Sequence, residues 1–406
     1  MTVHAGAPTS DIESPYAWTR LGAAVILATI GGVGMWSVVV ALPAIQADFG
    51  VDRAAAALPY TLTMIGFGAG GIATGRLADR FGVAVPLTMG TFALGLGYLA
   101  VGHAGSLTQL ALAHLLIGLG CSATFGPLMA DISHWFDRRR GIAVAIAAAG
   151  NYLAGTIWPP IVQHFIESSG WRATHNGIGL FLLVAMLPII LLLRRRLGDH
   201  HADAMAAARA PVASPVSPAT LQTLLCIAGV ACCVAMSMPQ VHLVAYCGDL
   251  GYGPARGAEM LSLMLGFGIF SRIGFGVVAD RIGGVRTLLL GSVLQGVALF
   301  LYLLFNGLTS LYVISALFGL FQGGIVPSYA IIVREYFPAR EAGTRVGLVL
   351  MATLAGMALG GWMSGVIFDL TGSYRAAFLN GLGWNLVNVS IVGLLLIRSR
   401  QRRALA

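Results

Sequence analysis

Lysine is absent from this sequence, and charged residues of any kind are scarce. All 24 basic residues are arginine, and charged residues make up only 10% of the 406 positions. Soluble globular proteins carry about 25% charged residues, so this scarcity excludes an ordinary soluble domain. With 57% hydrophobic residues, the chain has the composition of an integral membrane protein.

Cysteine is also rare, and the five cysteines lie within or beside apolar segments. Their spacing fits neither a metal site nor a disulfide framework, so we expect buried free thiols. The sequence contains no evident nucleophile–base pair, metal cluster or phosphate-binding loop, which argues against an enzyme, a cofactor and a metal. The net charge of +8 follows from where the arginines lie along the chain and does not indicate nucleic-acid binding.

Apolar runs long enough to cross a bilayer recur along the whole chain. A spanning helix needs about 20 apolar residues, whereas transmembrane β-strands alternate over about 10 residues. The sequence therefore predicts an all-α membrane protein with twelve transmembrane helices. Their approximate spans are 19–41, 55–75, 84–102, 107–133, 142–166, 174–193, 219–246, 257–278, 285–305, 308–333, 343–367 and 375–397.

A polar stretch rich in Ala, Pro and Ser divides these spans into two sets of six. We expect a cytoplasmic tail at 1–18, a first half at 19–193, a linker at 194–218, a second half at 219–397 and a tail at 398–406. The first residues lack the basic start of a signal peptide, so we expect no cleaved signal.

The placement of arginine predicts the orientation in the membrane. Nineteen arginines fall on the side that holds both tails and the linker, whereas the opposite side holds four, namely Arg53, Arg172, Arg256 and Arg375. The positive-inside rule then places both termini in the cytoplasm. We expect a multi-pass protein of the inner (plasma) membrane, embedded in the lipid bilayer.

The two halves carry the same motif at equivalent places. GRLADRFG at 75–82 is repeated as GVVADRIG at 276–283, and each copy follows the second span of its half. A duplicated six-helix unit is typical of secondary transporters whose site lies between the repeats. The octapeptide resembles the G-x-x-x-D-R-x-G signature of the major facilitator superfamily, and this resemblance implies the major facilitator fold.

The motifs suggest a gate made of charged residues and glycines. Arg80 and Arg281 are placed to reach Asp131 and Glu335, on the fourth and tenth spans, and could form charge latches between the halves that close in the outward-facing state. The first glycine of each motif would allow close helix approach. Alternatively, these residues only fix loop geometry. The candidate gating residues are Gly75, Asp79, Arg80, Gly82, Asp131, Gly276, Asp280, Arg281, Gly283 and Glu335.

Three further stretches resemble monocarboxylate transporters and oxalate/formate antiporters of that superfamily. They are HWFDRRRGIAVAIAAAGNYLAG at 134–155, MPQVHLVAYCGDLGY at 238–252 and the F-x-R-x-x-x-G core of MLGFGIFSRIGFGVVADRIG at 264–283. In such relatives the arginine of the eighth helix binds the substrate carboxylate, which implies this role for Arg272. Many relatives carry an acidic residue four positions earlier, where this chain has Gly268.

The depth of Arg272 points to the same role. Eight positions separate it from Asp280, which at 1.5 Å per residue puts it about 12 Å inside a hydrocarbon core about 30 Å thick. An arginine there costs about 2.5–3.5 kcal/mol and keeps its proton. No Asp or Glu lies at mid-membrane depth, so we expect a substrate carboxylate to be its partner. The alternative is a structural arginine bonded to backbone carbonyls.

These inferences predict a secondary transporter of small organic anions that works by alternating access, through proton symport or anion exchange. One central cation favours monocarboxylates over dicarboxylates. His242 is the candidate proton carrier because imidazole titrates near neutral pH, although a polar contact between helices is the alternative for each histidine. The other residues expected to line the substrate site are Trp36, Phe125, Asn151, Gln240, His242, Phe321, Gln322 and Tyr329.

Two other functions are compatible with twelve helices. An efflux carrier for hydrophobic or drug-like compounds would favour a central acid for cationic drugs, and none is present at mid-depth. A non-transporting sensor would need an appended soluble domain, and the tails and the linker are short. We expect the chain to function as a monomer.

Overall fold

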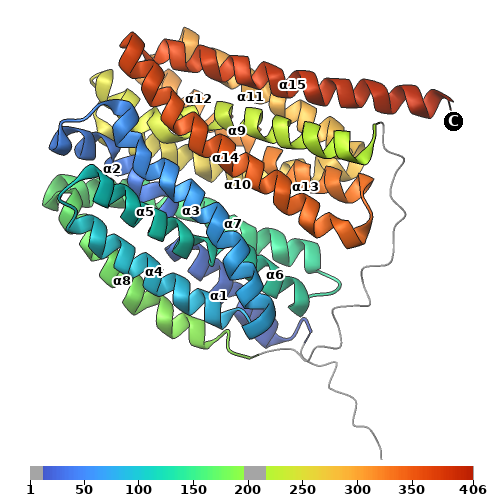
Figure 1. Ribbon diagram of the computed structural model, residues 1–406, viewed down its shortest axis with the longest axis horizontal. Helices are drawn as coiled ribbons and strands as arrows, with labels where there is room; N and C mark the ends of the chain where they lie inside the picture. Colours follow the sequence, from blue (N-terminus) through green and yellow to red (C-terminus); the bar gives the residue numbers. More distant parts are fainter. Residues whose placement is uncertain (1–11, 196–215, 406) are drawn as a thin grey trace, which may run out of the picture.

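The computed structural model describes residues 12–195 and 216–405, and within these ranges every regular element is an α-helix. The first eight helices are α1 (Pro15–Gly31), α2 (Val33–Phe49), α3 (Arg53–Phe81), α4 (Ala84–Gly102), α5 (Leu107–Ser122), α6 (Gly126–Trp135), α7 (Arg140–Ser169) and α8 (Trp171–Leu191). The other seven are α9 (Pro218–Asp249), α10 (Pro254–Ile282), α11 (Gly284–Leu304), α12 (Leu308–Gln322), α13 (Ile325–Tyr336), α14 (Ala339–Thr371) and α15 (Tyr374–Leu405). Figure 1 shows α1–α8 and α9–α15 as two bundles side by side.

Among the described residues, twelve helical segments are long and apolar enough to cross a membrane, which confirms the predicted architecture. Three of these segments are broken into two helices each, namely α1 with α2, α5 with α6, and α12 with α13. The breaks fall at Gly32, at residues 123–125 and at Gly323–Gly324, and the sequence analysis did not anticipate them. Most of the expected linker lies outside the described residues.

Side chains and glycines at the helix ends explain several of the helix boundaries. The hydroxyl groups of Ser14, Ser106 and Ser217 each accept a hydrogen bond from an amide of the first turn. Gly82 and Gly283 follow α3 and α10 with φ angles of 79° and 84°, a region that favours glycine. The last glycine of each repeated motif therefore ends a long helix and turns the chain.

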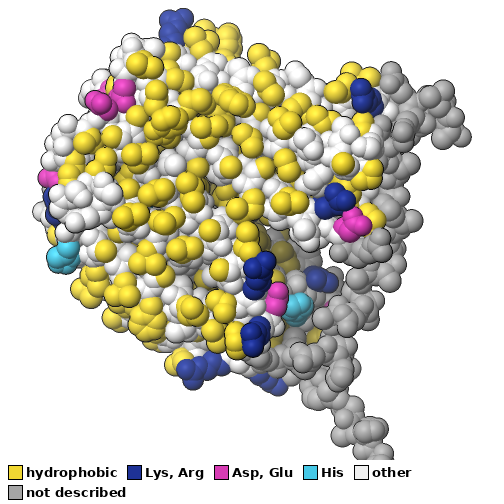
Figure 2. Space-filling view, viewed as in Figure 1, with side chains coloured by type: hydrophobic (Ala, Val, Ile, Leu, Met, Phe, Trp, Pro, Cys, Tyr) yellow, Lys and Arg dark blue, Asp and Glu magenta, His cyan; other side chains and the backbone are white. Residues whose placement is uncertain are grey.

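The outer flanks of the two bundles are apolar. Leu370 and Val184 are 80% and 74% exposed, respectively, and many other large apolar side chains are also exposed. Figure 2 shows hydrophobic side chains over the flanks, whereas charged side chains lie mainly near the two ends of the bundle. Exposed apolar surface on this scale is expected where a protein faces lipid.

The two halves meet mainly along two helix pairs, α3 with α14 and α7 with α10, and α2 adds a smaller contact with α9. One end of this interface, where α2 turns into α3, is called here the Arg53 side, and the opposite end is called the tail side. On the Arg53 side the backbones of α14 and α3 lie very close together. A Cβ atom added to Gly365 of α14 would lie 2.8 Å from Cα of Ala54 of α3. The halves are therefore tightly packed at this end.

The tail side differs, because α3 and α10 have open space beside their glycines there. A Cβ atom on Gly75 or Gly276 would meet nothing within 4 Å. The close helix approach predicted for these two glycines is therefore not present in this conformation. Figure 2 shows the surface hollowed between the halves on the tail side.

Candidate functional site

Arg272 lies on α10, where this helix packs against α7 of the other half. Its guanidinium carbon is 4.4 Å from the centre of the Tyr152 ring. Its Nε is buried without a hydrogen-bond partner, and in the described chain no carboxylate lies within salt-bridge distance of it. Stacking on an aromatic ring contributes about 0.5–2 kcal/mol but leaves the positive charge in place.

Three further hydrogen-bond donors are buried without a partner on α10 and on two other helices, namely Ser271 Oγ on α10, Trp36 Nε1 on α2 and Gln322 Nε2 on α12. Gln322 uses its other side-chain atom, Oε1, to accept from Gln240 Nε2 at 3.0 Å. A buried donor without an acceptor costs about 1–3 kcal/mol. These groups and Arg272 offer positive charge and donors, which suits an anion.

Close contacts tie these donors to the junction of α7 and α10. A Cβ atom on Gly155 of α7 would lie 3.0 Å from Trp36 Nε1. One on Gly323, directly after Gln322, would lie 3.0 Å from Ser271 Oγ. The break between α12 and α13 therefore lies against the turn of α10 that precedes Arg272.

Three other candidate residues lie on α7 or beside a helix break. Asn151 precedes Tyr152 and donates to Met35 Sδ at 3.3 Å. Phe125 is half-buried at the break between α5 and α6, and its ring centre is 6.0 Å from that of Phe67. Phe321 is half-buried just before the break between α12 and α13.

Tyr329 lies in the interior of the second half. Its side chain is fully buried, and its hydroxyl donates to Asn388 Oδ1 at 3.1 Å. Asn388 Nδ2 in turn donates to Ser292 Oγ at 2.7 Å. These hydrogen bonds join α13 to α15 and α11 in this conformation, and the substrate contact of Tyr329 stays a prediction.

His242 lies on the Arg53 side, between α9, α14 and α15. It is fully buried, with Nε2 2.7 Å from the carbonyl oxygen of Gly361 and Nδ1 3.4 Å from the Tyr374 hydroxyl. Its polar contacts join three helices of the second half, as in the alternative of a polar contact between helices, and its role in the substrate site stays a prediction.

A charged cluster that the sequence analysis did not predict surrounds Arg53. This buried side chain from the first half binds Asp249 of the second half at 3.1 Å and also donates to the Tyr374 hydroxyl. Its guanidinium carbon lies 4.7 Å from the centre of the Phe368 ring. The sequence showed Arg53 as one of few arginines on its side of the membrane. It did not show the partners of Arg53, which follow about 200 or more positions later in the chain.

Asp369 adds a second link between the halves at the same place. Its two carboxylate oxygens accept hydrogen bonds from the backbone amides of Arg53 and Ala54, at 2.9 and 2.8 Å. A carboxylate of α14 therefore caps the N-terminus of α3, where the helix dipole favours negative charge. We call Arg53, Asp249, Asp369, Tyr374 and His242 the Arg53 cluster.

The acids of the predicted tail-side latches bind within their own halves. Asp131 accepts two hydrogen bonds from Arg20, both at 2.7 Å, and Glu335 Oε1 accepts from the backbone amide of Gly284 at 3.0 Å. The first interaction joins α6 to α1, and the second caps α11.

The basic and acidic residues of the repeated motifs are exposed on the tail side. Among the described residues, Asp79, Arg80, Asp280 and Arg281 form no ion pair or side-chain hydrogen bond. The pairing of Arg80 with Asp131 and of Arg281 with Glu335 is therefore absent from this conformation, in which Asp131 binds Arg20 and Glu335 binds the Gly284 amide.

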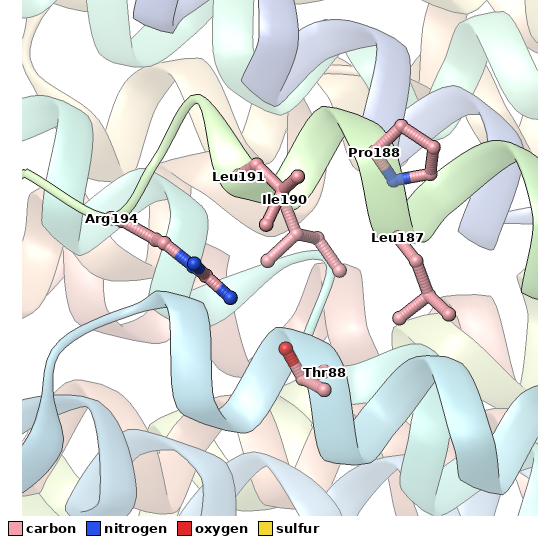
Figure 3. A pocket seen from close by; sticks show the side chains of 6 residues that line it. All are labelled: Thr88, Leu187, Pro188, Ile190, Leu191 and Arg194. Atoms are coloured by element: carbon pink, nitrogen blue, oxygen red, sulfur yellow. The ribbon is translucent and has the colours of Figure 1, made fainter.

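Two surface pockets lie away from Arg272. Figure 3 shows one of about 340 Å³ between α4 and α8, with mainly apolar walls formed by Thr88, Leu187, Pro188, Ile190, Leu191 and Arg194. The other, of about 550 Å³, opens between α2 and α9, and Arg53 and Asp249 contribute to its wall. Two members of the Arg53 cluster therefore border this surface pocket. The described residues include no group of three or more metal-ligating side chains.

Sequence and structure comparisons place this architecture among known transporters. The profile of the Major Facilitator Superfamily matches residues 24–310 and 260–405. Monocarboxylate transporter 13 of Rattus norvegicus is 31% identical over 288 residues, which cover 68% of this chain and 64% of that protein. The MFS-type transporter pynF of Aspergillus niger is 24% identical over 330 residues, which cover 80% and 75%.

The similarity in fold extends over nearly the whole chain. A bacterial homologue of the human lysosomal transporter Spinster, in an inward-facing and occupied conformation, superposes with a TM-score of 0.70 at 15% identity. The superposition covers 95% of this chain and 96% of that one. With twelve apolar helical segments among its described residues and a profile match along most of its length, this chain is a multi-pass membrane protein and belongs to the Major Facilitator Superfamily.

Proposed function

We propose that this transporter carries small organic anions, chiefly monocarboxylates, and that Arg272 binds the carboxylate. The observation that carries this proposal is a guanidinium with a buried, unpaired Nε and no carboxylate within salt-bridge distance in the described chain. Nearby buried donors at Trp36 and Gln322 support it, since they lack acceptors as well. The name of the rat relative, a monocarboxylate transporter, agrees with this substrate class.

The number of charges favours one carboxylate per substrate. A guanidinium binds a carboxylate through two parallel N–H···O bonds, which fix the orientation of the ligand as well as its charge. A second carboxylate would need another cation at the same depth, and Arg272 is the one arginine that the sequence places there. The apolar rings around the helix breaks would then contact the carbon skeleton of the substrate.

We further infer that transport proceeds by alternating access and that the tail side faces the cytoplasm. The arginine-rich tails and loops support this orientation in the plasma membrane. The conformation is then inward-facing, with the Arg53 cluster as the closed outer gate. Closing the tail side would bring the motif arginines towards the opposite half. Because both halves belong to one chain, a monomer would suffice.

The location of His242 bears on the mode of coupling, for which proton symport and anion exchange are the two candidates. A proton on this imidazole would add a cation within the Arg53 cluster, away from Arg272. Proton coupling through His242 would therefore act on the outer gate and not on the substrate. Uptake by the His242→Ala variant under an imposed pH gradient tests this role.

Uptake of labelled monocarboxylates into proteoliposomes tests the proposed function. Arg272→Gln should lower uptake by about 30-fold or more, because loss of one partner of a desolvated charge pair costs about 2–5 kcal/mol. Arg375→Gln is the matched control, since Arg375 is exposed and makes no side-chain hydrogen bond among the described residues. Equal uptake by the Arg272→Gln variant would overturn the proposal, as would preferred uptake of neutral amides.

A further inference from the structure

The strongest unexplained feature is the contact between Tyr152 and Arg272. Tyr152 belongs to α7 and Arg272 to α10, so the aromatic ring reaches across the interface between the halves. The guanidinium carbon lies 4.4 Å from the ring centre, within the range of a cation–π interaction. Tyr152 lies in the stretch HWFDRRRGIAVAIAAAGNYLAG at 134–155.

Gly268 makes this contact possible. It lies four residues before Arg272, and a Cβ atom there would be 2.2 Å from Cε1 and 2.6 Å from Cδ1 of Tyr152. The tyrosine ring therefore occupies the space that any side chain at position 268 would need. An acidic side chain one turn before Arg272 would otherwise be a neighbour of the arginine on the helix surface.

An aromatic partner and an acidic partner leave the guanidinium in different states. A carboxylate binds in the plane of the guanidinium, where it takes up the N–H donors and neutralises the charge. An aromatic ring covers the face of the guanidinium and leaves the in-plane donors available. The buried Arg272 Nε without a partner fits the second case.

We propose that Tyr152 is the positioning residue that holds Arg272 in the substrate site without neutralising it. The ring fills the hollow over Gly268 and fixes the guanidinium plane, so that a substrate carboxylate binds without displacing an internal counter-ion. Tyr152 and the carboxylate then contact Arg272 together, one on its face and the other at its edge. This inference rests on the proposed binding of carboxylates by Arg272.

Substitutions at Tyr152 test the positioning role through monocarboxylate binding to the purified, full-length protein. Tyr152→Phe keeps the aromatic face and should leave the dissociation constant within about threefold, whereas Tyr152→Leu should raise it by about tenfold. Phe165→Leu is the matched control, because Phe165 lies on the same helix and is 50% exposed. Equal effects of Tyr152→Phe and Tyr152→Leu would overturn the proposal.

A charge swap at Gly268 tests whether the partner must be neutral. With space made by Tyr152→Ala, the added substitution Gly268→Asp should weaken monocarboxylate binding by about tenfold relative to Gly268→Asn, because the new carboxylate competes for Arg272. The two double variants have side chains of nearly equal size, so a folding defect would affect both. Equal affinities would contradict the proposal.

These outcomes can be separated from failure of the proposed function itself. If Arg272→Gln binds monocarboxylates as well as the native protein does, Arg272 is not the anchor and both proposals fail. If Arg272→Gln loses binding while the Tyr152 and Gly268 variants show no difference, only the role of Tyr152 fails.

Discussion

The two ends of the interface between the halves are built from the same helices but are held in opposite ways. On the Arg53 side, α3 and α14 touch through glycine, and a buried arginine, two aspartates and a tyrosine join the halves. On the tail side, the glycines of α3 and α10 meet nothing, and the motif charges are exposed. Polar interactions across the interface are thus concentrated at the closed end.

This difference shows what has to be broken for the molecule to change state. Opening the Arg53 side would separate Arg53 from Asp249 and remove Asp369 from the N-terminus of α3. Each loss has a cost, which contacts formed on the tail side must offset. The following substitutions change one end at a time, and hydrogen exchange at residues 53–60 and 361–371 reports opening of the Arg53 side.

The largest effect is expected from Arg53→Gln. Removing one partner of a buried ion pair costs about 3–5 kcal/mol, and we expect about 2–4 kcal/mol here because Asp249 is 39% exposed. Amide exchange on the Arg53 side should accelerate. Arg172→Gln is the control, since it breaks an exposed pair with Asp48 inside one half. Similar exchange in both variants would show that the Arg53 cluster does not hold this end closed.

Two single variants, each adding one methyl group near a different end of α14, compare the packing of the Arg53 side with that of the tail side. Gly365→Ala would force Cβ against the Ala54 backbone, and overpacking of this kind costs about 1–3 kcal/mol. Gly347→Ala on the tail side meets open space and should leave this conformation unchanged. The expected result is faster exchange on the Arg53 side for Gly365→Ala alone. Matching profiles for the two variants would contradict the difference in packing.

A smaller effect is expected from Asp369→Asn. The substitution keeps the shape of the side chain but removes the charge that caps α3 across the interface, which is worth about 1 kcal/mol. Exchange should rise modestly in the first turn of α3. Asp52→Asn serves as control, because Asp52 precedes α3 but its side chain makes no capping hydrogen bond. An unchanged first turn in Asp369→Asn would argue against the cap.

The smallest effect on stability is expected from Asp79→Asn on the tail side. Asp79 is exposed and unpaired in the described chain, so the free energy of unfolding should stay within about 0.5 kcal/mol of the native value. If the motif charges bind only when the tail side closes, transport should nevertheless slow. Native transport rates for Asp79→Asn would leave the predicted latch without a role.

The twelve helices could be predicted because each apolar run is a continuous stretch of the sequence. The duplication of a six-helix unit could be predicted because the same motif recurs at 75–82 and 276–283. The sequence also singled out Arg272 by its charge and depth. It could not predict that Tyr152 covers Arg272, because that contact depends on how α7 and α10 meet. The buried hydrogen bond of Tyr329 to Asn388 could not be predicted for the same reason, since helix rotation decides whether a side chain faces the interface or the core. The partners of Arg53 lie too far along the chain for any local pattern.

The most direct test of the central claim is a thermal-shift titration of the purified protein with monocarboxylates, dicarboxylates and neutral amides. A ligand at a hundredfold excess over its Kd stabilises the folded state by about 2.7 kcal/mol. The account predicts that monocarboxylates stabilise the native protein and the Arg375→Gln variant but not Arg272→Gln. An equal shift for the Arg272→Gln variant would contradict the assignment of Arg272 as the carboxylate-binding residue.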